Sequence, residues 1–148
     1  MFELHARLAQ DTHIIGDFLL SRLLLMNDAN YPWFILVPRR TEIKEIFELG
    51  EQDQRQLLKE SSHLSHVIHR VFQADKINVA ALGNMVPQLH VHHIVRYQND
   101  PAWPHPVWGY CQAQPYKERT RQEICAALIE HLQDFTPDDN CTAPPRVC

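Results

Sequence analysis

The stretch QLHVHHIVRY, residues 88–97, decides how the rest of the chain is interpreted. Polar and apolar residues alternate over most of it, which is typical of a β-strand with two different faces. Successive side chains of a strand point to opposite sides, so His90 and His92 are expected on one face together with Gln88. The two histidines should lie about 7 Å apart, because each residue adds roughly 3.3 Å. His93 is expected on the other face, among apolar side chains.

The segments around this strand predict an antiparallel sheet covered by helices. Runs rich in apolar and β-branched residues, separated by turn residues, indicate strands at 17–28, 31–40, 76–82 and 88–97. Apolar spacings of three and four indicate a short helical segment after Thr41 and a long amphipathic helix over 51–73. The capping-box pair Thr120 and Glu123 predicts a C-terminal helix over 121–134, which Pro137 ends. The expected fold is α+β, with about five strands and the long helix packed on one face of the sheet.

Length and composition restrict the class of protein. A chain of 148 residues with 45% hydrophobic and 22% charged residues fits one domain with a real core. We expect this domain to span 1–136 and residues 137–148 to form a mobile tail. A net charge of −4 gives no broad cationic surface for a long nucleic acid or an anionic membrane. No apolar run approaches the ~18 residues of a membrane span, so no membrane partner is expected.

The cysteines and the start of the chain bear on its location. The four cysteines show no CxxC spacing, and the first residues lack a basic region followed by an apolar one. The sequence therefore predicts a protein of the reducing cytoplasm.

Two histidines on one strand face suit chemistry at phosphorus. A neutral imidazole is a good nucleophile, and a second polar group two residues along can bond the phosphate oxygens or the leaving group. No metal is needed for either role. The turn before the strand contains Gly83 and Asn84, and turns of this kind can direct N–H groups at an anion. His93 is expected to be half-buried and hydrogen-bonded to backbone or water.

INVAALGNMVPQLHVHHIVR, residues 77–96, resembles the signature region of the histidine triad (HIT) superfamily. In that region an Asn-containing strand leads to the pattern His-φ-His-φ-His, where φ is apolar. Residues 23–49 are similar to the family's strand, turn, strand and helix, and the resemblance covers roughly 20–97. The loop DPAWPHPVWG, residues 100–109, resembles a bacterial branch of nucleotide hydrolases.

The resemblance implies a mechanism and a set of site residues. His90 would attack the α-phosphate of a nucleotide derivative, a dinucleoside polyphosphate or a nucleoside phosphoramidate, to form a nucleotidyl-histidine that water then hydrolyses. His92 and Gln88 would contact phosphate oxygens or orient the nucleophile. The implied substrate contacts are Asn84 to the phosphate, Asn27 to the ribose, and Asn78. The resemblance also implies a homodimer, a small nucleotide as the partner, and no required cofactor or metal.

Two residues depart from the family pattern. Gln88 stands where the first histidine is expected, and an amide hydrogen-bonds but cannot shuttle a proton near neutral pH. His93 stands where an apolar residue is usual. Strand alternation turns it away from the row formed by Gln88, His90 and His92.

Two other functions stay open at this point. An HxH strand can chelate zinc or iron, with His105 or a cysteine completing the site, although the predicted helices argue against an all-β metal-binding fold. A nucleotide-binding module that lost catalysis together with its first histidine is the other alternative.

Several further residues have an ordinary interpretation beside a functional one. His63, His66 and His69 drift around the long helix and are expected to be solvated. The loop residues Trp103 and Trp108 could stack on a base, although covering a core is as common. Three arginines could meet an anion, although solvated strand-end positions are the ordinary case: Arg39, Arg40 and Arg96.

Overall fold

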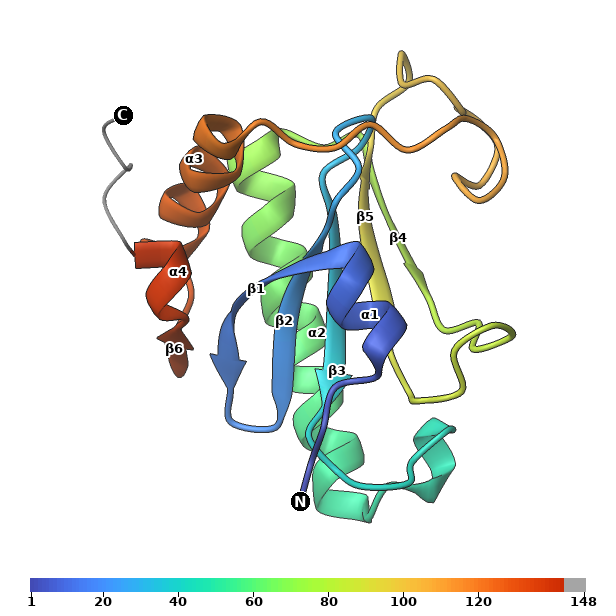
Figure 1. Cartoon of the computed structure of the whole chain (residues 1–148), viewed down its shortest axis with the longest axis vertical. Helices are drawn as coiled ribbons and strands as arrows, with labels where there is room; N and C mark the ends of the chain where they lie inside the picture. Colours follow the sequence, from blue (N-terminus) through green and yellow to red (C-terminus); the bar gives the residue numbers. More distant parts are fainter. Residues whose placement is uncertain (143–148) are drawn as a thin grey trace.

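The computed structural model describes residues 1–142, and a six-stranded antiparallel sheet forms its centre (Figure 1). The strand order across the sheet is β4-β5-β3-β2-β1-β6. The strands are β1 Thr12–Phe18, β2 Ser21–Met26, β3 Trp33–Pro38, β4 Lys76–Ala80, β5 Val91–Arg96 and β6 Phe135–Pro137. The central strands β3 and β5 are buried along their whole length, because both faces of the sheet are covered.

The helices lie on both faces of this sheet. They are α1 Ala6–Asp11, the 3-10 helix η1 Ile46–Glu48, α2 Glu51–Phe72, α3 Glu118–Ile129 and α4 Asp139–Thr142. The long helix α2 covers one face, where Phe34, Leu64 and Val91 share one apolar core with residues of α3 (Figure 1). α1 and the loop after β5 cover the other face, where Trp33 and Ile94 lie in a second core. None of the helices within residues 1–142 is both long and apolar enough to cross a membrane.

The α+β class and the long helix are confirmed, with six strands in place of about five. The predicted strand 17–28 divides, because Asp17 and Phe18 end β1 and the chain bends before β2. β1 contains Gly16, at an irregularity in its pairing with β2. A Cβ atom there would lie 2.3 Å from the Thr136 carbonyl oxygen, so only glycine lets β6 come this close. Gly16 therefore leaves the space in which the sixth strand, β6, pairs with β1.

The C-terminal region differs from its prediction. Helix α3 begins after Lys117, so Thr120 lies inside it and forms no capping box. It ends at Ile129, early enough for residues 135–137 to pair with β1. Within the expected tail, residues 137–142 contain the end of β6 and the short helix α4, and residues 143–148 lie outside the described residues.

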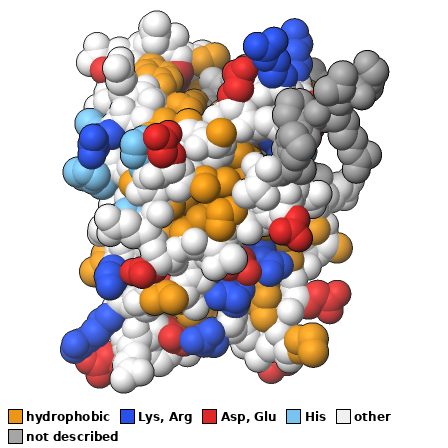
Figure 2. All heavy atoms as spheres, turned by 90° about the vertical axis from the view of Figure 1, so that its left-hand side faces the viewer, with side chains coloured by type: hydrophobic (Ala, Val, Ile, Leu, Met, Phe, Trp, Pro, Cys, Tyr) orange, Lys and Arg blue, Asp and Glu red, His pale blue; other side chains and the backbone are white. Residues whose placement is uncertain are grey.

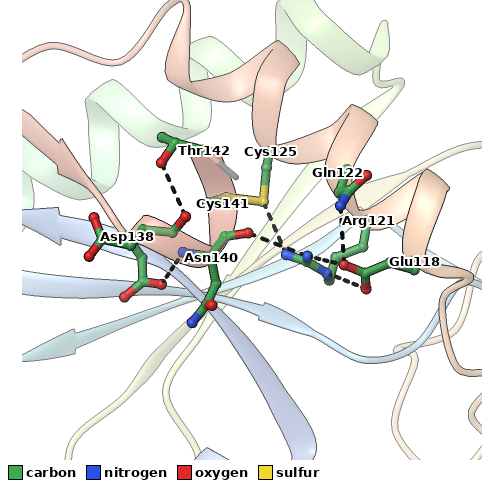
Figure 3. The surroundings of a disulfide bond; sticks show 9 residues. Glu118, Arg121, Gln122, Cys125, Asp138, Asn140, Cys141 and Thr142 are labelled. Carbon is green, nitrogen blue, oxygen red and sulfur yellow. Dashed lines mark hydrogen bonds and ion pairs between the residues drawn. A yellow bond between two sulfur atoms is a disulfide. The ribbon is translucent and has the colours of Figure 1, made fainter. Parts of the chain in front are cut away.

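A disulfide bond holds α4 against α3. It joins Cys125 to Cys141, both buried (Figure 3). Beside it, the Arg121 guanidinium pairs with Glu118 and donates to the Asn140 carbonyl oxygen. Because cysteines 16 residues apart show no recognisable spacing, the sequence does not reveal this bond.

Candidate active site

Strand alternation separates the three histidines as expected. The imidazole rings of His90 and His92 lie on the α1 side of the sheet, with ring centroids 4.9 Å apart. They are 8% and 4% exposed. His93 lies on the opposite face, where the hydroxyl of Ser61 on α2 contacts its Nε2 at 2.6 Å. His90 and His92 are thus one pair, and His93 belongs to the α2 core.

The hydrogen bond of His90 defines its tautomer. Its Nδ1 lies 2.7 Å from the carbonyl oxygen of Gln88, which can only accept, so Nδ1 carries a proton, and in the neutral ring Nε2 carries a lone pair. Nε2 makes no hydrogen bond with any of residues 1–142. Among these residues, the only buried side-chain polar atom without a hydrogen-bond partner is Ser21 Oγ, so the unpartnered Nε2 of His90 is not a buried atom. The lone pair of His90 Nε2 therefore reaches the surface.

His92 has the opposite tautomer. The indole N–H of Trp33 donates to its Nδ1 at 2.9 Å, so the proton of the neutral ring lies on Nε2. Burial first, and then the charges of His90 and His93, lower the pKa of His92 to about 3. His92 is therefore neutral at physiological pH. His92 Nε2 also makes no hydrogen bond within residues 1–142 and is not a buried unpartnered atom. Its N–H therefore reaches the surface beside the His90 lone pair.

His93 is more buried than expected. Its side chain is fully enclosed, and its Nδ1 donates to the Val91 carbonyl oxygen at 3.0 Å. Burial lowers the pKa of His93 to about 4, although the Val91 bond opposes the shift. A neutral ring that donates to backbone and accepts from Ser61 has no free nitrogen for chemistry.

The side-chain amide of Gln88 is already paired at both ends. Its Oε1 accepts from the backbone N–H of His5, and its Nε2 donates to the Glu3 carbonyl oxygen, each at 2.9 Å. Gln88 thus holds the N-terminal segment, residues 1–5, beside the histidine pair, just before α1 begins at Ala6. Its main-chain carbonyl, in contrast, orients His90.

Replacing Gln88 with alanine should release the N-terminal segment. Two hydrogen bonds of roughly 0.5–1.5 kcal/mol each are lost, so the His5 amide should exchange with solvent about 10-fold faster or more. Hydrogen–deuterium exchange of residues 1–5 measures the effect. The control is Gln122→Ala, which removes an exposed amide on α3. Unchanged exchange at His5 would show that Gln88 does not hold the segment.

The three asparagines lie in different places. The Asn27 side chain accepts from the Tyr116 backbone N–H at 2.9 Å, and Asn78 accepts from Arg96 at 2.7 Å. Asn84 is exposed in the turn before His90, and its side chain makes no hydrogen bond within residues 1–142. From the register of β2, β3 and β5, Asn27 lies roughly 16 Å from His90 along the strand direction. The structure thus brings together His90, His92 and Gln88, but not Asn27.

Arg96 is a buried structural residue, so its expected solvation is wrong. It forms a two-pronged ion pair with Asp100, and its guanidinium lies 5.8 Å from the ring centroid of Tyr31 and 5.7 Å from that of Trp103. Asp100 also accepts the backbone N–H groups of Tyr97 and Trp103. This cluster anchors the loop that follows β5.

The anchored loop carries Trp108 onto the histidine pair. The Trp108 ring is 5.1 Å from the ring of His92 and 5.6 Å from that of Trp33, nearly perpendicular to both. Sequence reasoning overlooked Trp33 as a site residue. Only the strand register, which pairs Ile35 with His92, places it beside that histidine.

The other polar candidates lie elsewhere. Arg39 donates to backbone carbonyls near the β1–β2 turn, and Arg40 pairs with Asp53. A separate hollow of about 510 Å³ between α2 and the end of α3 is lined by residues that include His63, His66 and His131. Figure 2 shows histidines gathered on this side of the molecule.

A metal-binding site of the HxH type lacks a third ligand. His105 stacks on Tyr110, and residues 1–142 contain no group of three His, Cys, Asp or Glu side chains that could hold a metal ion. Nothing in this arrangement favours the metal-binding alternative.

Comparisons with known proteins agree with this geometry. The family model of the HIT domain matches residues 7–99. A histidine triad protein from Bradyrhizobium japonicum is 47% identical, with a TM-score of 0.88 over 89% of this chain and 98% of that one. Histidine triad proteins from Sinorhizobium meliloti and Marinobacter aquaeolei are 45% and 54% identical, with TM-scores of 0.88 and 0.85 over 89% of this chain and 98% and 99% of theirs. The comparison with curated proteins finds no match.

Proposed function

Because the chain belongs to the histidine triad (HIT) family, whose members are generally nucleotide hydrolases or transferases, we propose that it acts on the α-phosphate of a nucleotide derivative. The proposed substrates are dinucleoside polyphosphates or nucleoside phosphoramidates. One observation carries the proposal: a lone pair on His90 Nε2, just before β5, and an N–H on His92 Nε2, in β5, reach the surface from two adjacent rings on the same side of the sheet. A nucleophile and a hydrogen-bond donor side by side suit attack on a phosphoryl group.

The proposed reaction has two steps. His90 Nε2 attacks the α-phosphorus, a P–N bond forms, and the bond from phosphorus to the leaving group breaks. A polyphosphate leaves as its anion, and an amine leaves after taking a proton from solvent. The imidazole of the adduct is positively charged, and the Nδ1–H bond to the Gln88 carbonyl oxygen stabilises this charge. Water then attacks phosphorus, the P–N bond breaks and returns its electron pair to His90 Nε2, a nucleoside monophosphate leaves, and the proton lost by the water passes to solvent. His92 Nε2–H donates to a phosphoryl oxygen in both steps.

Substrate contacts outside the histidine pair are part of the proposal. Asn84 has an unpaired carboxamide within the described residues and would bind the phosphate. Asn27 would bind the ribose, once its bond to Tyr116 is exchanged. Asn78 is the third proposed substrate contact, although its side-chain oxygen accepts from Arg96 in this structure, and no cofactor or metal is proposed for these steps.

Trapping the intermediate tests the proposal. The protein is incubated with a labelled dinucleoside polyphosphate or adenosine phosphoramidate and quenched, and the label is located by mass spectrometry. We expect a nucleotidyl adduct on His90. The second candidate is a nucleotide-binding module without turnover, favoured by the engagement of Gln88 with the N-terminal segment. Nucleotide binding without adduct or turnover would support that candidate.

We also propose a homodimer formed through β4. This strand lies at the edge of the sheet, paired only with β5, and its Val79 is 52% exposed. Leu58 on α2 is 68% exposed and lines a hollow together with Ile46 and Val79. An exposed apolar sheet edge is usually covered by a partner, and a second copy can supply the same edge.

Placing a charge on this edge should separate the protomers. In the variant Val79→Asp, a carboxylate would be buried at the interface, so the mass in solution should fall from dimer to monomer. Light scattering after size exclusion measures it. Leu19→Asp is the control, since Leu19 is also exposed, at 64%, but lies in the β1–β2 turn. A monomeric wild-type protein would contradict the proposed dimer.

A cytoplasmic location is proposed from the cysteine pattern, which shows no CxxC spacing. The disulfide bond between Cys125 and Cys141 counts against this location, because stable disulfides are rare in a reducing compartment.

A further inference from the structure

Trp33 lies directly beside the histidine pair, on a neighbouring strand. In the β3–β5 ladder Ile35 pairs with His92 and Trp33 pairs with Ile94, so Trp33 is a diagonal neighbour of His92 on the same face. The indole is buried, and its ring centroid is 5.6 Å from that of His92. Its N–H reaches His92 Nδ1 at 2.9 Å.

This contact restricts the proton positions of His92. An indole N–H can donate but never accept, so His92 Nδ1 must keep its lone pair to make the bond. The ring proton then lies on Nε2. In the protonated ring both nitrogens would donate, and the Nδ1–H would face the indole N–H. The Trp33 contact therefore disfavours both the Nδ1–H tautomer and the charged ring.

We propose that Trp33 is a positioning residue that holds His92 as the neutral Nε2–H tautomer, with its free N–H directed to the phosphoryl group. The role at the phosphoryl group rests on the proposed function. The low pKa of His92, lowered first by burial, agrees with a ring that stays neutral.

No other side chain of the row can take this role. Gln88 has both ends of its amide bound to residues 3 and 5. His90 makes its Nδ1 bond to the main chain, and no hydrogen bond joins it to His92 within the described residues. Trp108 packs against both the His92 and the Trp33 rings and limits their movement, but donates no hydrogen bond to either. Trp33 is thus the group that selects the proton position.

Loss of this bond has a chemical consequence. Without it, His92 can carry its proton on Nδ1 and present a lone pair to the phosphoryl oxygens, which repels them. The population of the productive tautomer falls, and the donor is missing when charge develops on phosphorus. Loss of the Trp33 bond should therefore weaken stabilisation of the transition state more than it weakens substrate binding.

The test compares wild type with Trp33→Phe, which keeps an aromatic ring but removes the N–H. Long-range ¹H–¹⁵N correlation spectra report the protonated nitrogen of each histidine. We expect His92 to be the Nε2–H tautomer in wild type, and to populate Nδ1–H with a raised pKa in the variant. For turnover we expect kcat to fall about 10-fold with a smaller change in KM.

Controls separate this role from packing and from the proposed function. Trp108→Phe removes an indole that is not bonded to His92, so the His92 tautomer should stay Nε2–H. A wild-type spectrum with the proton on Nδ1 would overturn the proposal even if Trp33→Phe fails to fold. An unchanged tautomer and pKa in a folded Trp33→Phe would also overturn it. A Trp33-dependent tautomer in a protein that forms no nucleotidyl adduct would support the positioning by Trp33 and contradict only the proposed function.

Discussion

Replacing His90 with alanine is expected to abolish the nucleotidyl adduct and to lower turnover by roughly 10,000-fold or more. The reason lies in the tautomers of the three histidines. His90 Nε2 carries the only imidazole lone pair of the three that reaches the surface without a partner. His92 cannot take over, because Trp33 occupies its Nδ1 and its Nε2 carries a proton. His93 is enclosed on the other face.

A panel of labelled nucleotides, each followed to adduct and product, measures this effect. The matched control is His69→Ala, which removes an exposed imidazole from α2, far from the pair in the sheet. It should leave both adduct and turnover unchanged. Equal activity of wild type and His90→Ala would refute His90 as the nucleophile.

Replacing Asp100 with alanine is expected to lower the free energy of unfolding by about 3–5 kcal/mol. The Arg96 guanidinium is 1% exposed, and Asp100 is its charged partner. Without Asp100, a positive charge stays buried with only the Asn78 oxygen and two aromatic rings beside it. The backbone N–H groups of Tyr97 and Trp103 lose their acceptor as well. The loop that carries Trp108 would lose its anchor.

Denaturant unfolding monitored by tryptophan fluorescence measures the loss. The matched control is Glu123→Ala, which removes the partner of Arg119 in an exposed pair with the same sequence separation. That pair lies in water, so the unfolding midpoint should barely change. A similar loss in both variants would show that burial of the Arg96 pair does not matter.

The Asp100 contribution should also depend on pH. Burial alone would raise the pKa of Asp100, but the hydrogen bonds from Arg96 and from backbone N–H groups outweigh it, so the pKa is lowered. A lowered pKa in the folded state stabilises the protein above the unfolded value of about 4, and this stabilisation is lost as the pH falls through the folded value. Wild type should therefore lose its advantage over Asp100→Ala on acidification below about pH 4.

Local patterns were sufficient for the long helix and for the two faces of β5. The alternation of a strand is a property of neighbouring residues, so the assignment of His93 to the opposite face follows without any tertiary information. The spacing of apolar residues along α2 is similarly local. These are the features that the structure confirms.

Features that depend on distant segments could not be predicted. β6 has three residues and exists only because Gly16, far away in the chain, leaves room for it. Arg96 has the sequence context of a solvated strand end, and only the folded loop supplies Asp100, Tyr31 and Trp103 around it. The link from Trp33 to His92 requires the register of β3 against β5.

Because both faces of β5 are buried, the number of residues in this strand is constrained. An in-frame deletion of the Val91 codon would place His90 and His92 next to each other on the strand, and so on opposite faces. His90, the proposed nucleophile, would then point into the α2 core beside Ser61, or the whole strand would turn over. The exposed turn at residues 82–85 can instead gain a codon without inverting any side chain of β5, as long as Asn84, the proposed phosphate contact, keeps its place. Between β4 and β5, length changes that leave the His90–His92 pair in place are therefore confined to the turn, whereas within β5 residues can be substituted but not added or removed.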